Sequence, residues 1–338
     1  MGGTALGVQA DRMDKYIYNE LEADVLTLQA KHGYMRTIPT FRNKRSFGDM
    51  DIVYRNDLYT VEDIIENFKY INGKYLKLLK SKKNGNVLSV LVNYDPDNQQ
   101  SKNKYQIDFI GYSEDIYDFA YHYHSYGDRG NLIGRIARQF DLKFGHNGLF
   151  YIQRDKEDWN VKLYDHLITD DFREALFILG FGINPKLEFN DVEEMYEWIC
   201  SSKLFNKEAF QFQNRPNKDV SRDKKREMYL GFLDYLEQTP IMSMNIDKTT
   251  FLNCVFNTYN MNDEIESVYK KQEINKEYKK VFNGKIVSDL TGLSGEELGK
   301  FMTYFFKWSA YSKEKIIQWS ASDQLRKHIL EVAKWYIS

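Results

Sequence analysis

The pattern of apolar and polar positions predicts alternating helices and strands in the first third of the chain. Residues 10–31 are a predicted helix, with apolar residues every three or four positions at Met13, Ile17, Leu21, Val25 and Leu28. Residues 51–54, 87–93 and 105–110 are predicted strands, since they are short, largely apolar runs bounded by polar turns. The last two runs follow one another along the chain, so we expect them to form an antiparallel hairpin.

The pattern beyond residue 110 is mixed at first and then becomes helical. A predicted helix carries Asn131, Arg135 and Arg138 on one face, and two short strands follow it within residues 140–152. From residue 162 onward the spacing of apolar residues is helical. The predicted helices cover residues 172–179, 191–200 (with Asn190 as N-cap), 227–238 and 263–281. The predicted fold class is therefore α+β, with an all-α C-terminal region.

Two carboxylates one residue apart stand at the head of a predicted strand. Asp49 and Asp51 follow a bend that ends at Gly48, and the alternation of side chains along a strand places both carboxylates on one face. Such a pair repels itself unless a cation lies between its members. Mg²⁺ binds one or two carboxylates together with substrate phosphates. Asp108, which interrupts the apolar run 105–110, supplies a third acid.

The alternative is that Asp49 and Asp51 are solvated turn residues, as most Asp-x-Asp pairs are. Two details favour a metal site. Gly48 lets a bulky ligand approach the backbone. An acid within an apolar strand, as at Asp108, costs free energy unless it has a partner.

Composition places the chain among globular proteins. The chain has 338 residues, which is long enough for two domains, and 42% of them are hydrophobic. The formal net charge of −2 excludes an overall positive field that would attract nucleic acid. Cys200 and Cys254 have no metal-ligand or redox spacing, which suits a reducing compartment. The N-terminus lacks a signal-peptide pattern, and no apolar run approaches the ~20 residues of a membrane span. We expect a soluble, cytoplasmic protein without a membrane partner.

Cationic residues and histidines gather at three places, and at each place the alternative is an ordinary segment without a functional role. One group leads into the acidic pair and consists of Arg36, Arg42, Lys44 and Arg45. It either faces phosphates or forms a solvated loop. Residues 214–226, the most basic stretch, either form a solvated linker or contact a nucleic-acid backbone. His122 and His124 lack a third ligand at metal-site spacing, so no metal is expected there.

The order of these motifs resembles the nucleotidyltransferases of the DNA polymerase β superfamily over residues 2–153. Gly48-Asp49-Met50-Asp51-Ile52 is similar to the family's Gly-Asp-x-Asp-hydrophobic motif, and Ile107-Asp108-Phe109 is similar to its third metal-ligand strand. The helix that follows Tyr126-Gly127 resembles the segment that closes over the nucleotide in family X polymerases. Gly2-Gly3-Thr4 resembles the Gly-Gly-Ser/Thr motif that binds triphosphate.

This resemblance implies a nucleotidyltransferase palm, a mixed sheet with flanking helices, at residues 1–155. It also implies two Mg²⁺ ions, replaceable by Mn²⁺, held by the catalytic acids Asp49, Asp51 and Asp108. The implied substrate is a nucleoside triphosphate (NTP) such as ATP. The residues implied to bind it are Gly3, Thr4, Arg45, Ser46, Gly48, Gly127, Asn131 and Arg135.

A second, shorter resemblance lies near the C-terminus. Residues 282–301 are similar to the tail of CCA-adding tRNA nucleotidyltransferases and bacterial poly(A) polymerases, where glycine-containing helix turns contact RNA. We therefore expect a helical connecting region at 156–213 and a helical, acceptor-binding domain at 214–338.

The implied activity moves a nucleoside monophosphate (NMP) from an NTP to a hydroxyl, with a nucleic-acid 3′ end as acceptor and tRNA-type RNA favoured over DNA. Two alternatives stay open. One is nucleotidylation of a protein side chain, which the net charge of −2 favours. The other is a catalytically idle nucleotide-binding scaffold, which the three retained acids disfavour.

Overall fold

The computed structural model describes residues 5–29, 34–70, 76–97, 102–215, 217–309 and 311–337. The chain divides into two compact units. The first unit contains Met1–Ile152 and Asp165–Val255, and the second contains Gln153–Tyr164 and Phe256–Ser338. The first unit resumes at Asp165, and residues 214–255 belong to it rather than to the unit of the C-terminal helices.

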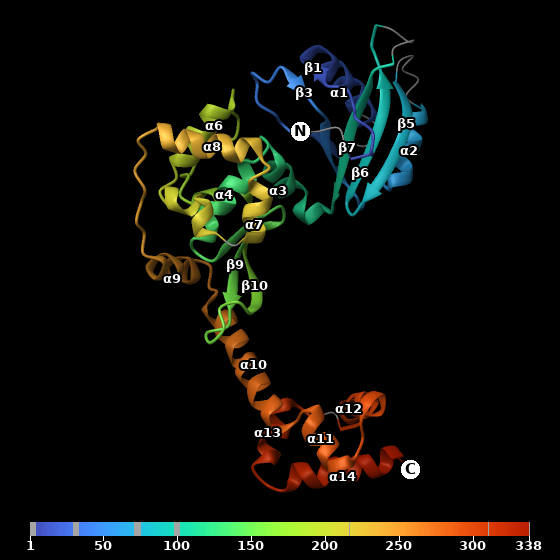
Figure 1. The fold of residues 1–338 in the computed structure, drawn as a ribbon, viewed down its shortest axis with the longest axis vertical. Helices are drawn as coiled ribbons and strands as arrows, with labels where there is room; N and C mark the ends of the chain where they lie inside the picture. The colour runs from blue at the N-terminus through green and yellow to red at the C-terminus, as the bar shows by residue number, and fades with distance from the viewer. Residues whose placement is uncertain are drawn as a thin grey trace. The chain divides into compact units, whose positions relative to one another are not determined.

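A five-stranded mixed sheet forms part of the first unit (Figure 1). In spatial order its strands are β2 (Met35–Thr37), β4 (Met50–Arg55), β7 (Lys104–Tyr112), β6 (Val87–Tyr94) and β5 (Leu76–Asn84). Strands β4 and β7 run parallel, and the other neighbouring pairs are antiparallel. The predicted hairpin of β6 and β7 is confirmed. The sequence pattern does not predict the edge strand β5, because its exposed lysines interrupt the alternation of apolar and polar residues. Lysines on an edge strand also discourage pairing with other chains.

Helices cover both faces of this sheet. They are α1 (Lys15–Gln29), α2 (Val61–Tyr70) and α3 (Glu114–His124). The first two share a core with Ile52, whereas α3 shares a core with Val53 on the opposite face. Alternation along β4 therefore puts Asp51 on the α3 side of the sheet.

A short two-stranded sheet anchors the loop before the acids. It pairs β1 (Met13–Asp14) with β3 (Ser46–Phe47) in antiparallel register. Because β1 uses the start of the expected helix, α1 begins at Lys15 rather than near residue 10. The Tyr18 ring of α1 stacks on Phe47 with ring centroids 4.0 Å apart, so the loop is tied to the helix by both backbone and side chain.

A smaller sheet and several helices complete the first unit. The sheet has the order β10 (Lys162–Thr169), β9 (Gly148–Arg154), β8 (Leu142–Gly145). The helices are α4 (Arg129–Arg138), α5 (Phe172–Ile178), α6 (Val192–Cys200), α7 (Asn217–Asp223), α8 (Glu227–Gln238) and α9 (Lys248–Thr258), with 3₁₀ turns at Lys207–Ala209 and Phe212–Asn214. The predicted turn between β8 and β9 is confirmed. The helical pattern expected from residue 162 onward is wrong at its start, where β10 forms a strand, and α9 was not predicted.

Two local predictions in this part are wrong. Helix α6 is capped by Asp191 rather than Asn190, because Asp191 Oδ1 accepts a hydrogen bond from the backbone N of Glu194 at 3.0 Å. Residues 214–226 are not a solvated linker, because Asp223 within them is buried and pairs with Arg215.

The second unit is helical and has its own core. Its helices are α10 (Asn262–Val281), α11 (Gly284–Thr291), α12 (Gly295–Ser309), α13 (Lys313–Ser320) and α14 (Gln324–Ile337). The segment 153–164 joins this unit through Gln153 Nε2, which donates to the carbonyl oxygen of Ile265 at 3.0 Å. The predicted helix at 263–281 is confirmed as α10. In the described ranges, no helix combines the length and the apolar character that crossing a membrane requires.

Candidate active site

Three carboxylates meet on the α3 side of the larger sheet. Asp51 of β4 lies directly beside Asp108 of β7 in the parallel register, and Asp49 immediately precedes β4. Ser89 of β6 is the register partner of Asp108 on its other side. The parallel pairing of β4 with β7 therefore brings the acids of two distant sequence motifs together.

The acids repel one another. Burial raises the pKa of Asp51 to about 7, and the negative charges of Asp49 and Asp108 add to this increase. Burial also raises the pKa of Asp108, against hydrogen bonds with Ser89 and Gln106 that lower it. A bound cation would remove this repulsion and favour the ionised carboxylates.

Asp108 is held by its neighbour two positions earlier on the same face of β7. Gln106 Nε2 donates to Oδ1 and Oδ2 of Asp108 at 3.1 and 3.0 Å. Gln106 Oε1 in turn accepts a hydrogen bond from the backbone N of Ala5 at 3.1 Å. The predicted triphosphate residues Gly3 and Thr4 lie outside the described residues. Gln106 was not among the predicted site residues, although its i, i+2 spacing to a strand carboxylate was a usable signal.

The segment that carries Arg42, Lys44 and Arg45, called the basic loop below, supplies one cation to the acids. Burial lowers the pKa of Lys44, while the charges of Asp49 and Asp51 oppose this change, so the ammonium lies within the field of both carboxylates. Arg45 is exposed and Gly48 is buried at the bend. Ser46, a predicted nucleotide-binding residue, accepts a hydrogen bond at Oγ from Arg12 Nε at 2.8 Å.

The predicted nucleotide helix is present as α4, but its polar face binds a carboxylate of the chain itself. Asn131 Nδ2 donates to Asp223 Oδ1 at 3.2 Å, and Arg135 Nη2 donates to Asp223 Oδ2 at 3.1 Å. Gly127 precedes α4 with φ of 63°, and a Cβ there would lie 2.6 Å from Met228 Cε. Asp223 lies 88 residues from Arg135 in the sequence, so no local pattern marks it as a partner of α4.

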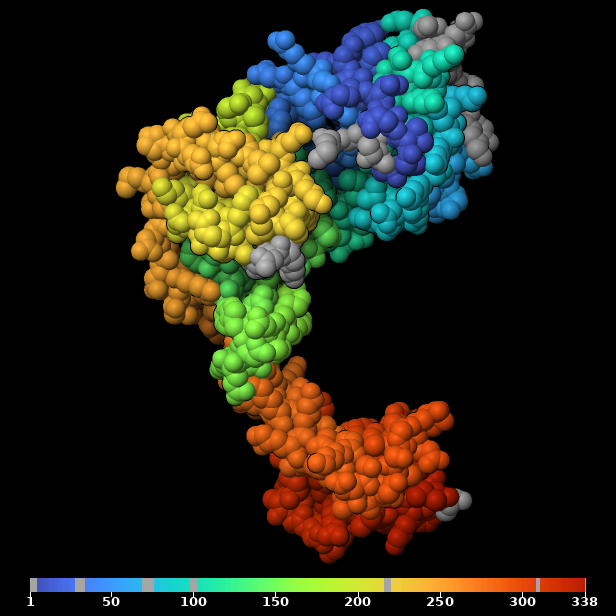
Figure 2. All heavy atoms as spheres, in the orientation of Figure 1, coloured from blue at the N-terminus to red at the C-terminus, as the bar shows by residue number. Residues whose placement is uncertain are grey.

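A cavity of about 380 Å³ joins this helix to the acids. Its lining includes Asp51, Gly127, Asn131, Arg222 and Arg226. Asp51 therefore shares a cavity with two of the predicted nucleotide residues. The yellow surface of α7 and α8 adjoins the green part of the chain in Figure 2, which agrees with the hydrogen bonds from α4 to Asp223.

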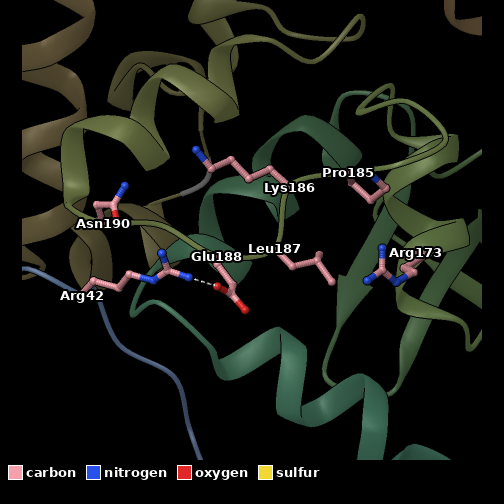
Figure 3. Close-up of a pocket in the computed structure, with 7 residues that line it drawn as sticks. All are labelled: Arg42, Arg173, Pro185, Lys186, Leu187, Glu188 and Asn190. Carbon is pink, nitrogen blue, oxygen red and sulfur yellow. Dashed lines mark hydrogen bonds and ion pairs between the residues drawn. The ribbon is translucent and has the colours of Figure 1, made fainter.

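A second cavity, of about 450 Å³, lies beside the basic loop (Figure 3). It is lined by Arg42, Arg173, Pro185, Lys186, Leu187, Glu188 and Asn190. Figure 3 shows Arg42 paired with Glu188, and Lys186 pairs with Glu194. Two of its three cations therefore already have carboxylate partners, which makes it a weaker anion site than the cavity at Asp51.

His122 and His124 are neutral structural residues. Burial lowers the pKa of each to about 4. His124 Nε2 and the Tyr112 hydroxyl share a hydrogen bond of 2.7 Å, and His122 stacks on Phe172 with ring centroids 5.0 Å apart.

The donor set at the acids fits a hard divalent ion in kind. Asp49, Asp51 and Asp108 offer only oxygen, which Mg²⁺ prefers, and their mutual repulsion is the electrostatic condition that a cation relieves. Within the ranges that the structure describes, no group of three or more His, Cys, Asp or Glu side chains forms a ready-made metal site. The fit therefore rests on donor chemistry and repulsion, without a preformed cage.

Comparison with known protein families finds none that matches this chain, and comparison with curated proteins finds no match either.

Proposed function

We propose that the protein is a Mg²⁺-dependent nucleotidyltransferase that moves an NMP from an NTP to an acceptor hydroxyl, and that its larger sheet is the palm of the polymerase β superfamily. The observation that carries this proposal is the register of β4 and β7, which sets Asp51 beside Asp108. Two partly buried carboxylates with raised pKa values are costly unless a cationic ligand is bound.

In this proposal Asp49, Asp51 and Asp108 would hold two Mg²⁺ ions, for which Mn²⁺ could substitute. The metal would supply charge neutralisation and a lowered pKa for the attacking hydroxyl. The hydroxyl oxygen bonds to the α-phosphorus, and the bond from that phosphorus to the bridging oxygen breaks. Pyrophosphate leaves with the electron pair. Asp108, oriented by Gln106, accepts the hydroxyl proton.

The nucleotide occupies the cavity that Asp51 shares with Gly127 and Asn131. Lys44 faces the acids and adds positive charge for phosphate. The helical C-terminal region contributes to acceptor binding, with a tRNA-type RNA 3′ end favoured over DNA. A protein side chain is the second candidate acceptor, favoured by the net charge of −2.

The test is label transfer by the purified chain. Each α-labelled NTP is incubated with Mg²⁺ and with tRNA, DNA primers or total protein, and Asp51→Asn and Asp49→Ala variants run alongside. Glu66→Gln, which removes a charge from an exposed position of α2, is the matched control. We expect label on one acceptor class, at least 100-fold less label with either aspartate variant, and no change with Glu66→Gln.

Label on one acceptor class identifies the acceptor. Equal labelling by the wild type and both aspartate variants would contradict the assignment of the site. No label on any acceptor, from a folded chain that binds NTP, would replace the enzyme with the nucleotide-binding scaffold.

A further inference from the structure

The cavity at Asp51 carries opposite charges on different parts of its wall. Asp51 lies on the sheet, whereas Arg222 and Arg226 come from α7 and from the residue that precedes α8. More than 160 residues separate Asp51 from Arg222 in the sequence, and the predicted linker 214–226 is the segment that supplies both arginines. The fold therefore brings the most basic stretch of the chain to the acidic site.

The two arginines differ in their ion-pair partners within the chain. Arg226 Nη1 forms an ion pair with Asp128, and Arg226 Nε lies 3.8 Å from Asp223 Oδ1. Arg222 is exposed, and no described carboxylate forms an ion pair with it. Arg222 and Tyr123 both line the cavity, and the charge of Arg222 partly opposes the rise that burial causes in the pKa of Tyr123. Arg222 is thus the cation of this wall that is open to an incoming anion.

The backbone that carries Arg222 is firmly held. The next residue, Asp223, has a side chain only 1% exposed, and it pairs with Arg215 and Arg135. Asn131 of α4 donates to the same carboxylate. The backbone position of Arg222 is therefore set before any ligand arrives, which removes the entropic cost of ordering this segment on binding.

The charges of the cavity define the ligand that fits. Asp51 repels an anion unless the anion arrives with a divalent cation, whereas Arg222 attracts phosphate oxygens directly. Tyr123 and the uncharged His124 add aromatic rings to the lining of the same cavity. A metal-bound polyphosphate attached to a flat base meets all three conditions.

We propose that Arg222 binds the β- and γ-phosphates of a nucleoside triphosphate whose metal-bound α-phosphate faces Asp51. This inference rests on the proposed function, because it concerns the same site. It assigns the basic segment of α7 to the nucleotide, where the sequence had offered only a solvated face or a nucleic-acid backbone contact.

The test is equilibrium binding of ATP, AMP and inorganic tripolyphosphate to the full chain with Mg²⁺, by titration calorimetry without acceptor. The variants are Arg222→Ala, Arg222→Lys and, as matched control, Lys225→Ala, which removes the same charge from an exposed position three residues away that does not line the cavity. We expect Arg222→Ala to weaken ATP and tripolyphosphate at least tenfold and AMP less than twofold. Arg222→Lys should restore part of the loss, and Lys225→Ala should change nothing.

The inference is overturned by unchanged ATP binding of Arg222→Ala, by an equal loss of AMP and ATP binding, or by an equal loss with Lys225→Ala. It is also overturned if a short single-stranded RNA binds the wild type but not Arg222→Ala while both bind ATP equally, because this result would assign Arg222 to the acceptor backbone.

The same variants separate this inference from the proposed function. If the wild type binds ATP with the expected pattern but transfers no label, the inference stands and the transferase proposal falls. If the wild type transfers label and Arg222→Ala has an unchanged KM for NTP, the transferase stands and the inference falls.

Discussion

At the scale of single residues, the carboxylates of Asp49, Asp51 and Asp108 form a cluster of negative charge on the larger sheet. The pKa of Asp51 is raised by burial and, in addition, by the two neighbouring carboxylates. Lys44 opposes this charge, and its own pKa is lowered by burial. One half-buried ammonium does not balance three carboxylates, which is why the proposed function includes an added cation.

The substitution Asp51→Asn should stabilise the metal-free protein at pH 8. The folded-state pKa of about 7 lies above the ordinary value, so the folded state holds a proton that the unfolded state releases. The wild type therefore loses stability as the pH rises from about 4 to 7, by an amount on the order of a few kcal/mol. Thermal unfolding without metal at pH 8 and pH 5 checks this.

The gain from Asp51→Asn should be larger at pH 8 than at pH 5, and added Mg²⁺ should raise the melting temperature of the wild type but not that of Asp51→Asn. Glu66→Gln should show no gain at pH 8, because its carboxylate is exposed, and should respond to Mg²⁺ as the wild type does. A variant destabilised at both pH values would mean that the Asp51 carboxylate is already compensated within the chain.

At the scale of elements, α7 is joined to α4 by a buried charge cluster. Asp223 has an exposed side-chain fraction of 1%, Arg215 of 3% and Arg135 of 12%. A buried carboxylate shared by two guanidinium groups adds little net stability over apolar packing, but removing one partner is expensive. The cluster therefore sets the position of α7, and of Arg222 on it, more than it contributes to the free energy of folding.

The substitution Asp223→Ala should destabilise the region around α7 by roughly 3–5 kcal/mol, because it leaves Arg215 and Arg135 buried without their carboxylate. Hydrogen exchange read by mass spectrometry checks this. Amides of α4 and α7 should exchange faster, while those of α11 and α14 in the second unit provide an internal control. Unchanged protection of α7 would show that other contacts hold this helix.

Helix α3 should make the first unit sensitive to acid. The pKa values of His122 and His124 are lowered to about 4, chiefly by burial. Their folded-state pKa lies below the unfolded value near 6.5, so stability is lost as the pH falls from about 6.5 to 4. This effect opposes that of Asp51, whose protonation stabilises the metal-free protein over part of the same range.

The substitution His122→Phe should make this decline shallower by roughly 1–3 kcal/mol at pH 4, because a phenyl ring can stack on Phe172 but cannot be protonated. Urea unfolding at pH 7 and pH 4 measures the difference. An identical decline in the wild type and the variant would place the acid sensitivity elsewhere.

At the scale of the whole molecule, all described residues of the candidate site belong to the first unit. The second unit has a separate core, centred on Phe301, Phe305 and Ile329. The segment 153–164 depends on this second core, since Lys276 Nζ of α10 lies 3.2 Å from Asp155 Oδ2.

A chain that ends at residue 258, after α9, should keep a folded first unit and bind NTP within about twofold of the full chain. Transfer to a nucleic-acid acceptor should fall if the C-terminal helices hold that acceptor. Hydrogen exchange of β4, β7 and α4 provides the folding control, and faster exchange is expected only around residues 153–164. A shortened chain with unprotected β4 and β7 would contradict the independence of the first unit.

The sequence by itself determined the elements with strong local signals. The β4 strand with Asp51, the β6–β7 hairpin with Asp108 and the helices α4, α8 and α10 follow from alternation, helical spacing and polar turns. These local patterns also fix which face of a strand a carboxylate occupies. The mixed α/β class and the helical C-terminal region follow from the same patterns.

Only the tertiary structure decided which distant residues meet. The parallel pairing of β4 with β7, the Gln106 contact to Asp108 and the burial of Asp223 against α4 depend on packing between segments far apart in the chain. Local periodicity carries no information about such partners. It therefore described residues 214–226 by their charge alone, whereas the fold buries Asp223 and leaves Arg222 facing the cavity at Asp51.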